Sequence, residues 1–178
     1  MVLNGIGSVG KSSIARALQA IASQPMLHVQ MDAFLDMLPA ALQGHPDAFT
    51  YETIEEDGRP VVAIKGGHVG TPLMRGMIRA IAAMAGEGNS LIVYEVMDGG
   101  KWQSYAAALA PFTVHLAGLF APLEVLEARE RARGDRLIGL ARWQFSRVHK
   151  GMKYDLEIDT TKASPEECAE QIKAKFAL

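Results

Sequence analysis

A glycine-rich segment close to the N-terminus carries the clearest chemistry in this sequence of 178 residues. Residues 5–12 read G-I-G-S-V-G-K-S, which satisfies the phosphate-binding loop (P-loop) pattern G-x-x-x-x-G-K-[ST]. In such a loop, backbone N–H groups surround phosphate oxygens, and the following helix directs its positive end at the same anions. The lysine would reach the β- and γ-phosphates, and the final hydroxyl would ligate Mg²⁺. The nucleotide-contacting residues are therefore predicted to be Gly5, Gly7, Ser8, Val9, Gly10, Lys11, Ser12 and Ser13.

Asp32 is the leading candidate for a catalytic acid–base group. It follows a predicted strand over 27–31, and parallel sheets bind their ligands at the carboxyl ends of the strands. A carboxylate in that place could orient and deprotonate an acceptor hydroxyl. Aspartate is also a favoured helix N-cap, and a helix is predicted over 33–43. From position alone, Asp32 suits a catalytic base and a helix cap equally well.

A second acid stands near the end of the apolar run 91–96, which has the composition of a strand buried on both faces of a parallel sheet. Glu95 there resembles the acid that holds Mg²⁺, directly or through water, in P-loop proteins, and Asp98 is a nearby alternative. The other interpretation is a strand-end acid that faces solvent. We predict that Ser12 and Glu95 form the magnesium site.

Four arginines fall within eight residues: Arg129, Arg131, Arg133 and Arg136. Guanidinium groups suit phosphate oxygens, and a cationic lid would stabilise the charge on a phosphoryl group in transfer. A solvated helix face with ion pairs at i,i+4 spacing is the alternative. Because the same chain carries a P-loop, we predict an arginine-rich lid over 129–148.

Composition excludes several classes of protein. A net charge of −2 argues against a broad nucleic-acid surface, and the only cysteine, Cys168, rules out an intramolecular disulfide or a Cys-rich zinc site. The five histidines show no metal-ligand spacing. No apolar run approaches the roughly 20 residues that span a bilayer, and no signal peptide is recognisable. We expect a cytoplasmic protein without nucleic-acid or membrane partners, whose oligomeric state the sequence leaves open.

The elements that must position these residues alternate between strand and helix, which predicts an α/β domain with a mainly parallel sheet over 1–178. The first strand, 1–4, is only the tail of a usual one, so we expect either a brief strand or a longer native N-terminus. Strands are predicted at 27–31, 91–96, 113–119 and 154–159, and helices at 14–21, 33–43, 71–85, 101–110, from 122 into the arginine-rich stretch, and from 165 onward.

Residues 33–75 interrupt this alternation. The dipeptide Asp57-Gly58 between the segments 51–54 and 61–64 predicts a β-hairpin. One domain of this length leaves no room for a separate substrate domain. We therefore expect the acceptor pocket to come from 33–75 and from the lid.

These segments together resemble the chloramphenicol phosphotransferase-like family of P-loop kinases. The most specific segments are R-A-R-G-D-R, then V-H-K-G-M-K-Y-D, and then D-T-T. The resemblance covers nearly the whole chain and is carried by residues 3–13, 31–39, 91–100, 128–136, 148–161 and 164–169.

The resemblance implies a three-layer P-loop fold and an ATP- and Mg²⁺-dependent kinase that phosphorylates a hydroxyl of a small molecule. The family's catalytic base falls on Asp32, which favours catalysis over helix capping for that residue. Its other catalytic positions fall on Lys11, Arg133 and Arg136, and its nucleotide contacts on Ser12, Arg129, Thr160 and Thr161, the last two beside the adenine.

Two features depart from the family's pattern. The central strand of the family usually ends in two aspartates, whereas this chain has Tyr94-Glu95, and residues 40–70 match only in pattern. The resemblance therefore predicts the reaction better than the acceptor. Chloramphenicol, and with it antibiotic resistance, is one hypothesis, and a sugar, a nucleotide sugar or another antibiotic are others. A non-catalytic ATP-binding regulatory protein and a structural domain with a chance P-loop are the remaining alternatives.

Overall fold

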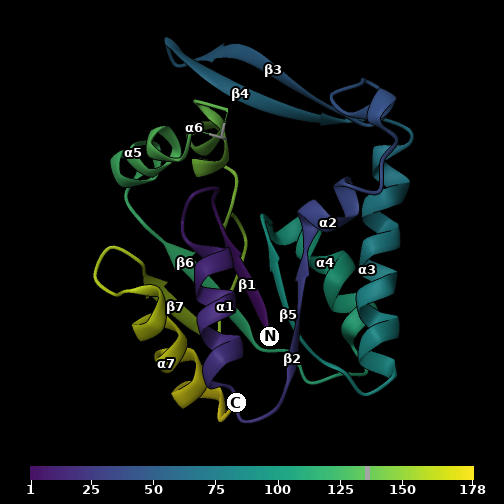
Figure 1. The fold of residues 1–178 in the computed structure, drawn as a ribbon. Coiled ribbons are helices and arrows are strands. Elements are labelled where there is room, and N and C mark those ends of the chain that lie inside the picture. The colour runs from purple at the N-terminus through teal and green to yellow at the C-terminus, as the bar shows by residue number, and fades with distance from the viewer. Residues whose placement is uncertain (135–136) are drawn as a thin grey trace.

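The centre of the molecule is a parallel β-sheet of five strands in the order β2-β5-β1-β6-β7. A computed structural model describes residues 1–134 and 137–178. Because every strand runs the same way, all five carboxyl ends lie along one edge of the sheet, which Figure 1 shows at the top. The strands are β1 (Val2–Gly5), β2 (Met26–Gln30), β5 (Ser90–Glu95), β6 (Leu116–Phe120) and β7 (Leu156–Asp159).

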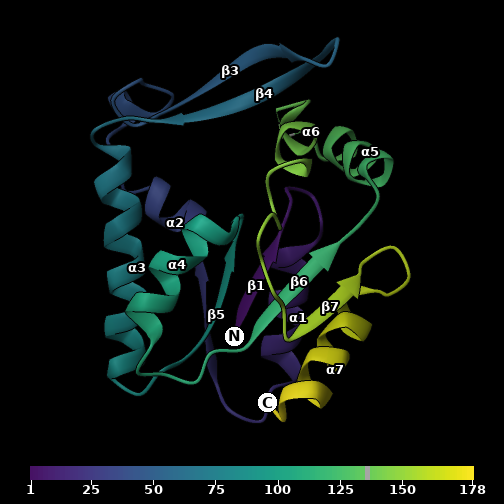
Figure 2. The same ribbon diagram turned by 180° about the vertical axis from the view of Figure 1, so that it is seen from behind.

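Helices cover both faces of this sheet, so the predicted three-layer α/β architecture is confirmed (Figures 1 and 2). Helices α1 (Lys11–Ile21) and α7 (Pro165–Phe176) pack on one face, and α3 (Gly70–Gly86) and α4 (Gly99–Leu109) on the other. Successive side chains of a strand point to opposite faces. In β5, Ile92 therefore joins the core under α1, whereas Val93 joins the core under α3 and α4.

A separate antiparallel hairpin lies above the carboxyl edge of the sheet. It consists of β3 (Phe49–Glu56) and β4 (Arg59–Gly66), and its turn residues Asp57 and Gly58 both have positive φ. That conformation is the one the Asp-Gly dipeptide favours in two-residue hairpins, so the predicted hairpin is confirmed. The hairpin reaches from α3 across to α6 (Leu140–Phe145), beside α5 (Leu123–Arg133).

The helix predicted over 33–43 is wrong in extent. The structure has a short helix α2 (Met31–Leu35), a turn, and a single 3₁₀ turn η1 (Ala40–Leu42). Pro39 disfavours helical backbone at the residue before it, and neither short helix has a fully buried residue to stabilise a longer one. Gln30 is the N-cap of α2, so Asp32 lies in the first helical turn and does not cap it.

Most other boundaries agree with the sequence to within a few residues. The last helix begins with the predicted capping box, in which Ser164 and Glu167 exchange side-chain and backbone hydrogen bonds. No helix in the described ranges combines the length and hydropathy that a membrane span requires.

Candidate active site

A cavity of about 850 Å³ opens over the carboxyl edge of the sheet. Its walls come from the loop before α1, from α2, from the hairpin, from α5 and α6, and from the loop after β7. The structure thus brings together segments that are far apart in the sequence. Predicted site residues on its lining are Gly7, Ser8, Val9, Gly10, Lys11, Ser12, Ser13, Asp32, Arg129, Arg133, Thr160 and Thr161.

The predicted phosphate-binding loop connects β1 to α1. Gly10 is the N-cap of α1 with a φ of 102°, a left-handed conformation that glycine adopts without steric cost. Gly5 lies just below the cavity rather than on its lining, and a Cβ there would stand 2.9 Å from the carbonyl oxygen of Leu119. Glycine is thus required at the start of the loop by close packing and at its end by backbone conformation.

Lys11 lies at the floor of this loop and is only 9% exposed. Its Nζ donates hydrogen bonds to the carbonyl oxygens of Gly5 (2.6 Å) and Ile6 (2.9 Å). These two carbonyl oxygens carry no formal charge, and Lys11 places its ammonium beside the N-terminus of α1. Such a site attracts an anion.

Asp32 faces the same cavity from α2. Within the described part of the chain, no hydrogen bond or ion pair engages its carboxylate. Glu130, the other acid on the lining, is 2% exposed and accepts hydrogen bonds from the backbone N–H groups of Gly139 and Ala141, each at 2.8 Å. Among the lining residues that the structure describes, Asp32 is therefore the carboxylate that the cavity can offer to a ligand.

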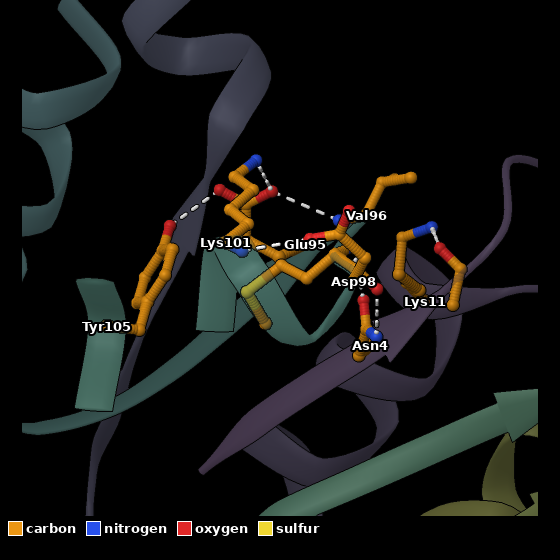
Figure 3. Close-up of polar contacts among 9 residues, drawn as sticks. Asn4, Lys11, Glu95, Val96, Asp98, Lys101 and Tyr105 are labelled. Atoms are coloured by element: carbon orange, nitrogen blue, oxygen red, sulfur yellow. Dashed lines mark hydrogen bonds and ion pairs between the residues drawn. The ribbon is translucent and has the colours of Figure 1, made fainter. Parts of the chain in front are cut away.

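Glu95 has a different setting from the one predicted. It ends β5, but it lies on the face covered by α4, is 1% exposed and does not line the cavity. Figure 3 shows its carboxylate directed at α4, where it accepts hydrogen bonds from Tyr105 Oη (2.5 Å) and Lys101 Nζ (2.7 Å). Asp98, the alternative acid, accepts from the backbone N–H of Lys101 and caps α4. Neither acid faces the predicted phosphate site.

The arginine-rich stretch is divided among several roles. Arg133 lines the cavity from the end of α5, as predicted for a lid residue. Arg129 lines it too, and its guanidinium donates to the hydroxyl (3.0 Å) and the carbonyl oxygen (2.9 Å) of Thr160. Arg131 is exposed on α5. Arg136 lies outside the described residues.

The loop after β7 is held by short-range hydrogen bonds. Asp159 accepts from the backbone N–H and the hydroxyl of Thr161, which hold the pKa of its carboxyl down at about 2. Thr160 is buried and receives Arg129, as described above. This loop therefore presents Thr161 to the cavity in a fixed conformation.

Several lining residues could not be found from the sequence. Gln144 of α6 is 4% exposed, and its Oε1 accepts a hydrogen bond from the backbone N–H of Gly7 at 2.7 Å, which joins the lid to the phosphate loop. No motif marks a single glutamine of this kind. Apart from Asp32, the lining that comes from α2, from the hairpin and from the end of β5 is apolar and aromatic and consists of Met31, Leu35, Tyr51, Ile64, Tyr94 and Val96.

A series of hydrogen-bonded side chains begins at Asn4, the residue just before the phosphate loop. Asn4 in β1 donates to the carbonyl oxygen of Met97 (2.9 Å) and to Tyr154 Oη (2.7 Å), and Tyr154 Oη lies 2.6 Å from Nδ1 of His149. Burial, together with the positive charge of Lys11, lowers the pKa of His149 to about 4. The imidazole is therefore neutral at pH 7.

No group of three or more His, Cys, Asp or Glu side chains in the described ranges is arranged to hold a metal ion. Magnesium in kinase sites is held by one or two protein oxygens together with substrate phosphates and water. The Ser12 hydroxyl on the cavity wall fits such a site.

Comparisons with known proteins agree with this geometry. A sequence profile of the family described as "Chloramphenicol phosphotransferase-like protein" matches residues 1–177. A Mycobacterium tuberculosis (strain ATCC 25618 / H37Rv) protein named "Putative O-phosphotransferase Rv2636" is 29% identical over 184 residues, which span 99% of this chain and 81% of the relative.

Solved kinase structures share the fold. A sugar kinase from Janibacter sp. HTCC2649 superposes with a TM-score of 0.68 at 17% identity, covering 99% of this chain and 92% of that one. A gluconokinase from Sinorhizobium meliloti 1021 gives a TM-score of 0.67 at 16% identity, with coverages of 99% and 90%. At these identities the likeness shows that the chain has the fold of P-loop kinases.

Proposed function

Because this chain belongs to the chloramphenicol phosphotransferase-like family, and is thus a kinase-type phosphotransferase, we propose that it moves the γ-phosphoryl group of ATP to a hydroxyl of a small molecule. One observation carries the proposal: the unengaged carboxylate of Asp32 shares a cavity with Lys11 and Ser12. An acid, a cation and a metal-binding hydroxyl around one space are the groups that phosphoryl transfer needs.

The phosphate loop binds the triphosphate in this proposal. Backbone N–H groups of residues 7–12 and the N-terminus of α1 surround the phosphate oxygens, and Lys11 Nζ exchanges its carbonyl partners for the β- and γ-phosphates. Ser12 contributes its hydroxyl to Mg²⁺, which neutralises developing charge on the phosphates when it is bound. Arg129, Thr160 and Thr161 border the adenine side.

Asp32 serves as the catalytic base. Its carboxylate orients the acceptor hydroxyl in line with the γ-phosphorus and takes its proton as the new O–P bond forms and the bond to the β-phosphate oxygen breaks. Arg133 on the cavity wall and Arg136 stabilise the charge on the transferred group. Positioning and charge stabilisation supply most of the rate enhancement.

The acceptor enters from the side of the hairpin, so residues 33–75 and the lid form its pocket within one domain, 1–178. The apolar and aromatic lining near Asp32 favours an acceptor with an apolar or aromatic part beside its hydroxyl, for which chloramphenicol is the first compound to test. A sugar or a nucleotide sugar is the alternative. The dependence on ATP leads us to expect a cytoplasmic enzyme.

The experiment is a panel of acceptors incubated with Mg²⁺ and ATP labelled in its γ-phosphate. Chloramphenicol, gluconate, neutral sugars and nucleotide sugars each enter the panel, and transfer is read as label in the acceptor. We expect label in at least one hydroxylated acceptor, and faster transfer to those with an apolar part. ATP that binds but labels no acceptor would support the regulatory alternative, and a protein that binds no nucleotide would contradict the proposal.

A further inference from the structure

We propose that Glu95 positions the acceptor side of the cavity and does not hold magnesium, because the Lys101 ammonium already supplies the positive charge that its carboxylate requires. The acceptor part of this inference rests on the function proposed above. The pairing of Glu95 with Lys101 and Tyr105 stands on the structure alone.

Strand geometry is the first support. Along β5 and just beyond it, Tyr94 and Val96 pack against the core under α1, which begins at the phosphate loop. Glu95 lies between them on the opposite face, with Val93 and Tyr105 of the other core. Figure 3 shows the Glu95 carboxylate turned to α4, away from Lys11. At this end of β5, Tyr94 and Val96 thus line the cavity that also contains Ser12, and Glu95 does not.

The hydrogen bonds of Glu95 are the second support. Its side chain is fully buried, and its two oxygens accept from Tyr105 Oη, Lys101 Nζ and the backbone N–H of Val96, the last at 3.0 Å. A buried carboxylate is stable only when it is paired and hydrogen-bonded. The carboxylate is therefore balanced without a metal ion.

Lys101 is itself held in place. Its backbone N–H donates to Asp98 Oδ1 in the first turn of α4, and its side chain, 32% exposed, reaches Glu95. Tyr105 is one turn further along α4 and completely buried, and burial beside the Glu95 carboxylate raises the pKa of its hydroxyl. The neutral phenol is thus a hydrogen-bond donor at every working pH.

The hydrogen bonds of Glu95 with Lys101 and Tyr105 hold the end of β5 against α4. The residues on either side of Glu95 line the cavity, and Tyr94 Oη donates to Gln30 Oε1 at 3.1 Å, just before α2 and Asp32. Moving Glu95 would therefore move the wall that Tyr94 and Val96 present to the acceptor. Lys101 and Tyr105 are positioning residues that act through this wall.

The test consists of three measurements on the full chain, and the first uses a double-mutant cycle of Glu95→Gln and Lys101→Met. The first measurement is the urea midpoint of unfolding without nucleotide. We expect Lys101→Met to lower it, because a buried carboxylate loses its partner, and Glu95→Gln in the same chain to restore at least half of the loss. An unchanged midpoint in Lys101→Met, or no restoration in the double variant, would overturn the pairing.

The second measurement is the Mg²⁺ concentration that half-saturates binding of a fluorescent ATP analogue. Glu95→Gln should leave it within twofold of the wild type, whereas Ser12→Ala, the positive control, should raise it at least tenfold. An increase of fivefold or more in Glu95→Gln would restore Glu95 as a magnesium acid and overturn the proposal. If the wild type binds no nucleotide, the proposed function fails, and the unfolding cycle still decides the pairing.

The third readout separates positioning from general stability. Tyr105→Phe keeps the ring and removes the hydroxyl, so we expect the KM of the acceptor to rise at least threefold while the KM of ATP changes less than twofold. Equal changes in both KM values, or no change in either, would reject the positioning role.

Discussion

Among single residues, Lys11 shows how a buried ammonium group can be stable in the protein before a phosphate binds. Its ammonium donates hydrogen bonds to the carbonyl oxygens of Gly5 and Ile6. Because these oxygens carry no formal charge, breaking the two bonds would leave no unpaired anion in the loop. The carbonyls belong to the loop that would bind the triphosphate. Arrival of an anion then improves the electrostatic environment of Lys11.

Lys11→Ala is expected to weaken nucleotide binding by about 10- to 100-fold, since hydrogen bonds to charged groups contribute roughly 1.5–3 kcal/mol. Phosphoryl transfer should fall as well, because we propose that the same ammonium contacts the γ-phosphate. Isothermal titration with Mg²⁺-ATP and the labelled-ATP assay measure the two effects. Lys175→Ala, an exposed lysine at the far end of α7, is the matched control. Unchanged binding and turnover in Lys11→Ala would reject the phosphate-loop assignment.

His149 makes stability depend on pH. Its pKa of about 4 in the folded protein lies below the ordinary value of 6.5, so between these values the unfolded chain binds more protons than the folded one. The free energy of unfolding should therefore fall as the pH drops from about 6.5 to about 4, and it should be constant with respect to this group above that range.

Urea unfolding of the wild type and of His149→Gln between pH 4 and 8 tests this expectation. The variant, which has no imidazole at this position, should lose less stability than the wild type on acidification. His68→Gln removes an exposed histidine and should keep the slope of the wild type. Parallel pH profiles for the wild type and His149→Gln would contradict the account.

Among the helices and strands, patterns of residues close together in the sequence predicted most of the fold. The capping box at Ser164 and the Asp57-Gly58 turn involve residues close in sequence, and both are confirmed. The helix over 33–43 failed because apolar spacing alone does not show whether a core exists to bury those side chains. Glu130 and Gln144 were missed because their partners are 9 to 137 residues away in the chain.

For a related reason, the sequence did not predict that the Glu95 side chain is directed at α4. The sequence places it correctly at the end of a buried strand, but which face a strand residue occupies depends on register with neighbouring strands. Its partners, Lys101 and Tyr105, lie on α4, and no sequence motif predicts that they bind Glu95. The phosphate loop, by contrast, is a pattern of neighbouring residues, so its position between a strand and a helix could be predicted from the sequence.

The short helix α6 depends on Glu130. The buried carboxylate accepts from the N–H groups of Gly139 and Ala141 and so satisfies donors at the start of this helix. Glu130→Ala should lower the free energy of unfolding by about 1–3 kcal/mol, as expected for buried donors left unsatisfied. Glu130→Gln, which keeps one acceptor oxygen, should lose less. Urea titration measures both, and equal stabilities of wild type and Glu130→Ala would contradict the capping role.

An ion pair and a backbone hydrogen bond join the hairpin to the lid. Arg147 binds both oxygens of Glu56 (2.7 and 3.2 Å) and lies over the ring of Trp143, while the N–H of Val62 donates to the carbonyl oxygen of Gly139. Arg147→Met should make amide exchange in β4 about two- to fivefold faster, as for loss of an exposed ion pair. Lys65→Met removes the exposed Glu52 pair on the same hairpin and is the control. Equal exchange rates in wild type and Arg147→Met would reject the contact.

At the scale of the whole molecule, the near-neutral net charge conceals a separation of charge. The arginine-rich lid and the acidic hairpin meet above the carboxyl edge of the sheet, where the ion pair of Arg147 and Glu56 joins them. The cavity between them is lined by the basic residues Lys11, Arg129 and Arg133 and by apolar and aromatic residues of α2, the hairpin and the end of β5.

The most direct test of Asp32 as the catalytic base is phosphoryl transfer by Asp32→Asn, measured beside nucleotide affinity in the same preparation. Loss of a positioned general base lowers rates by about 10²- to 10⁴-fold, and the P-loop contacts do not involve this side chain. We predict a loss of that size in label transfer with an ATP affinity within threefold of the wild type, whereas Asp36→Asn, an exposed acid at the end of α2, keeps both. Full transfer activity in Asp32→Asn would contradict the account.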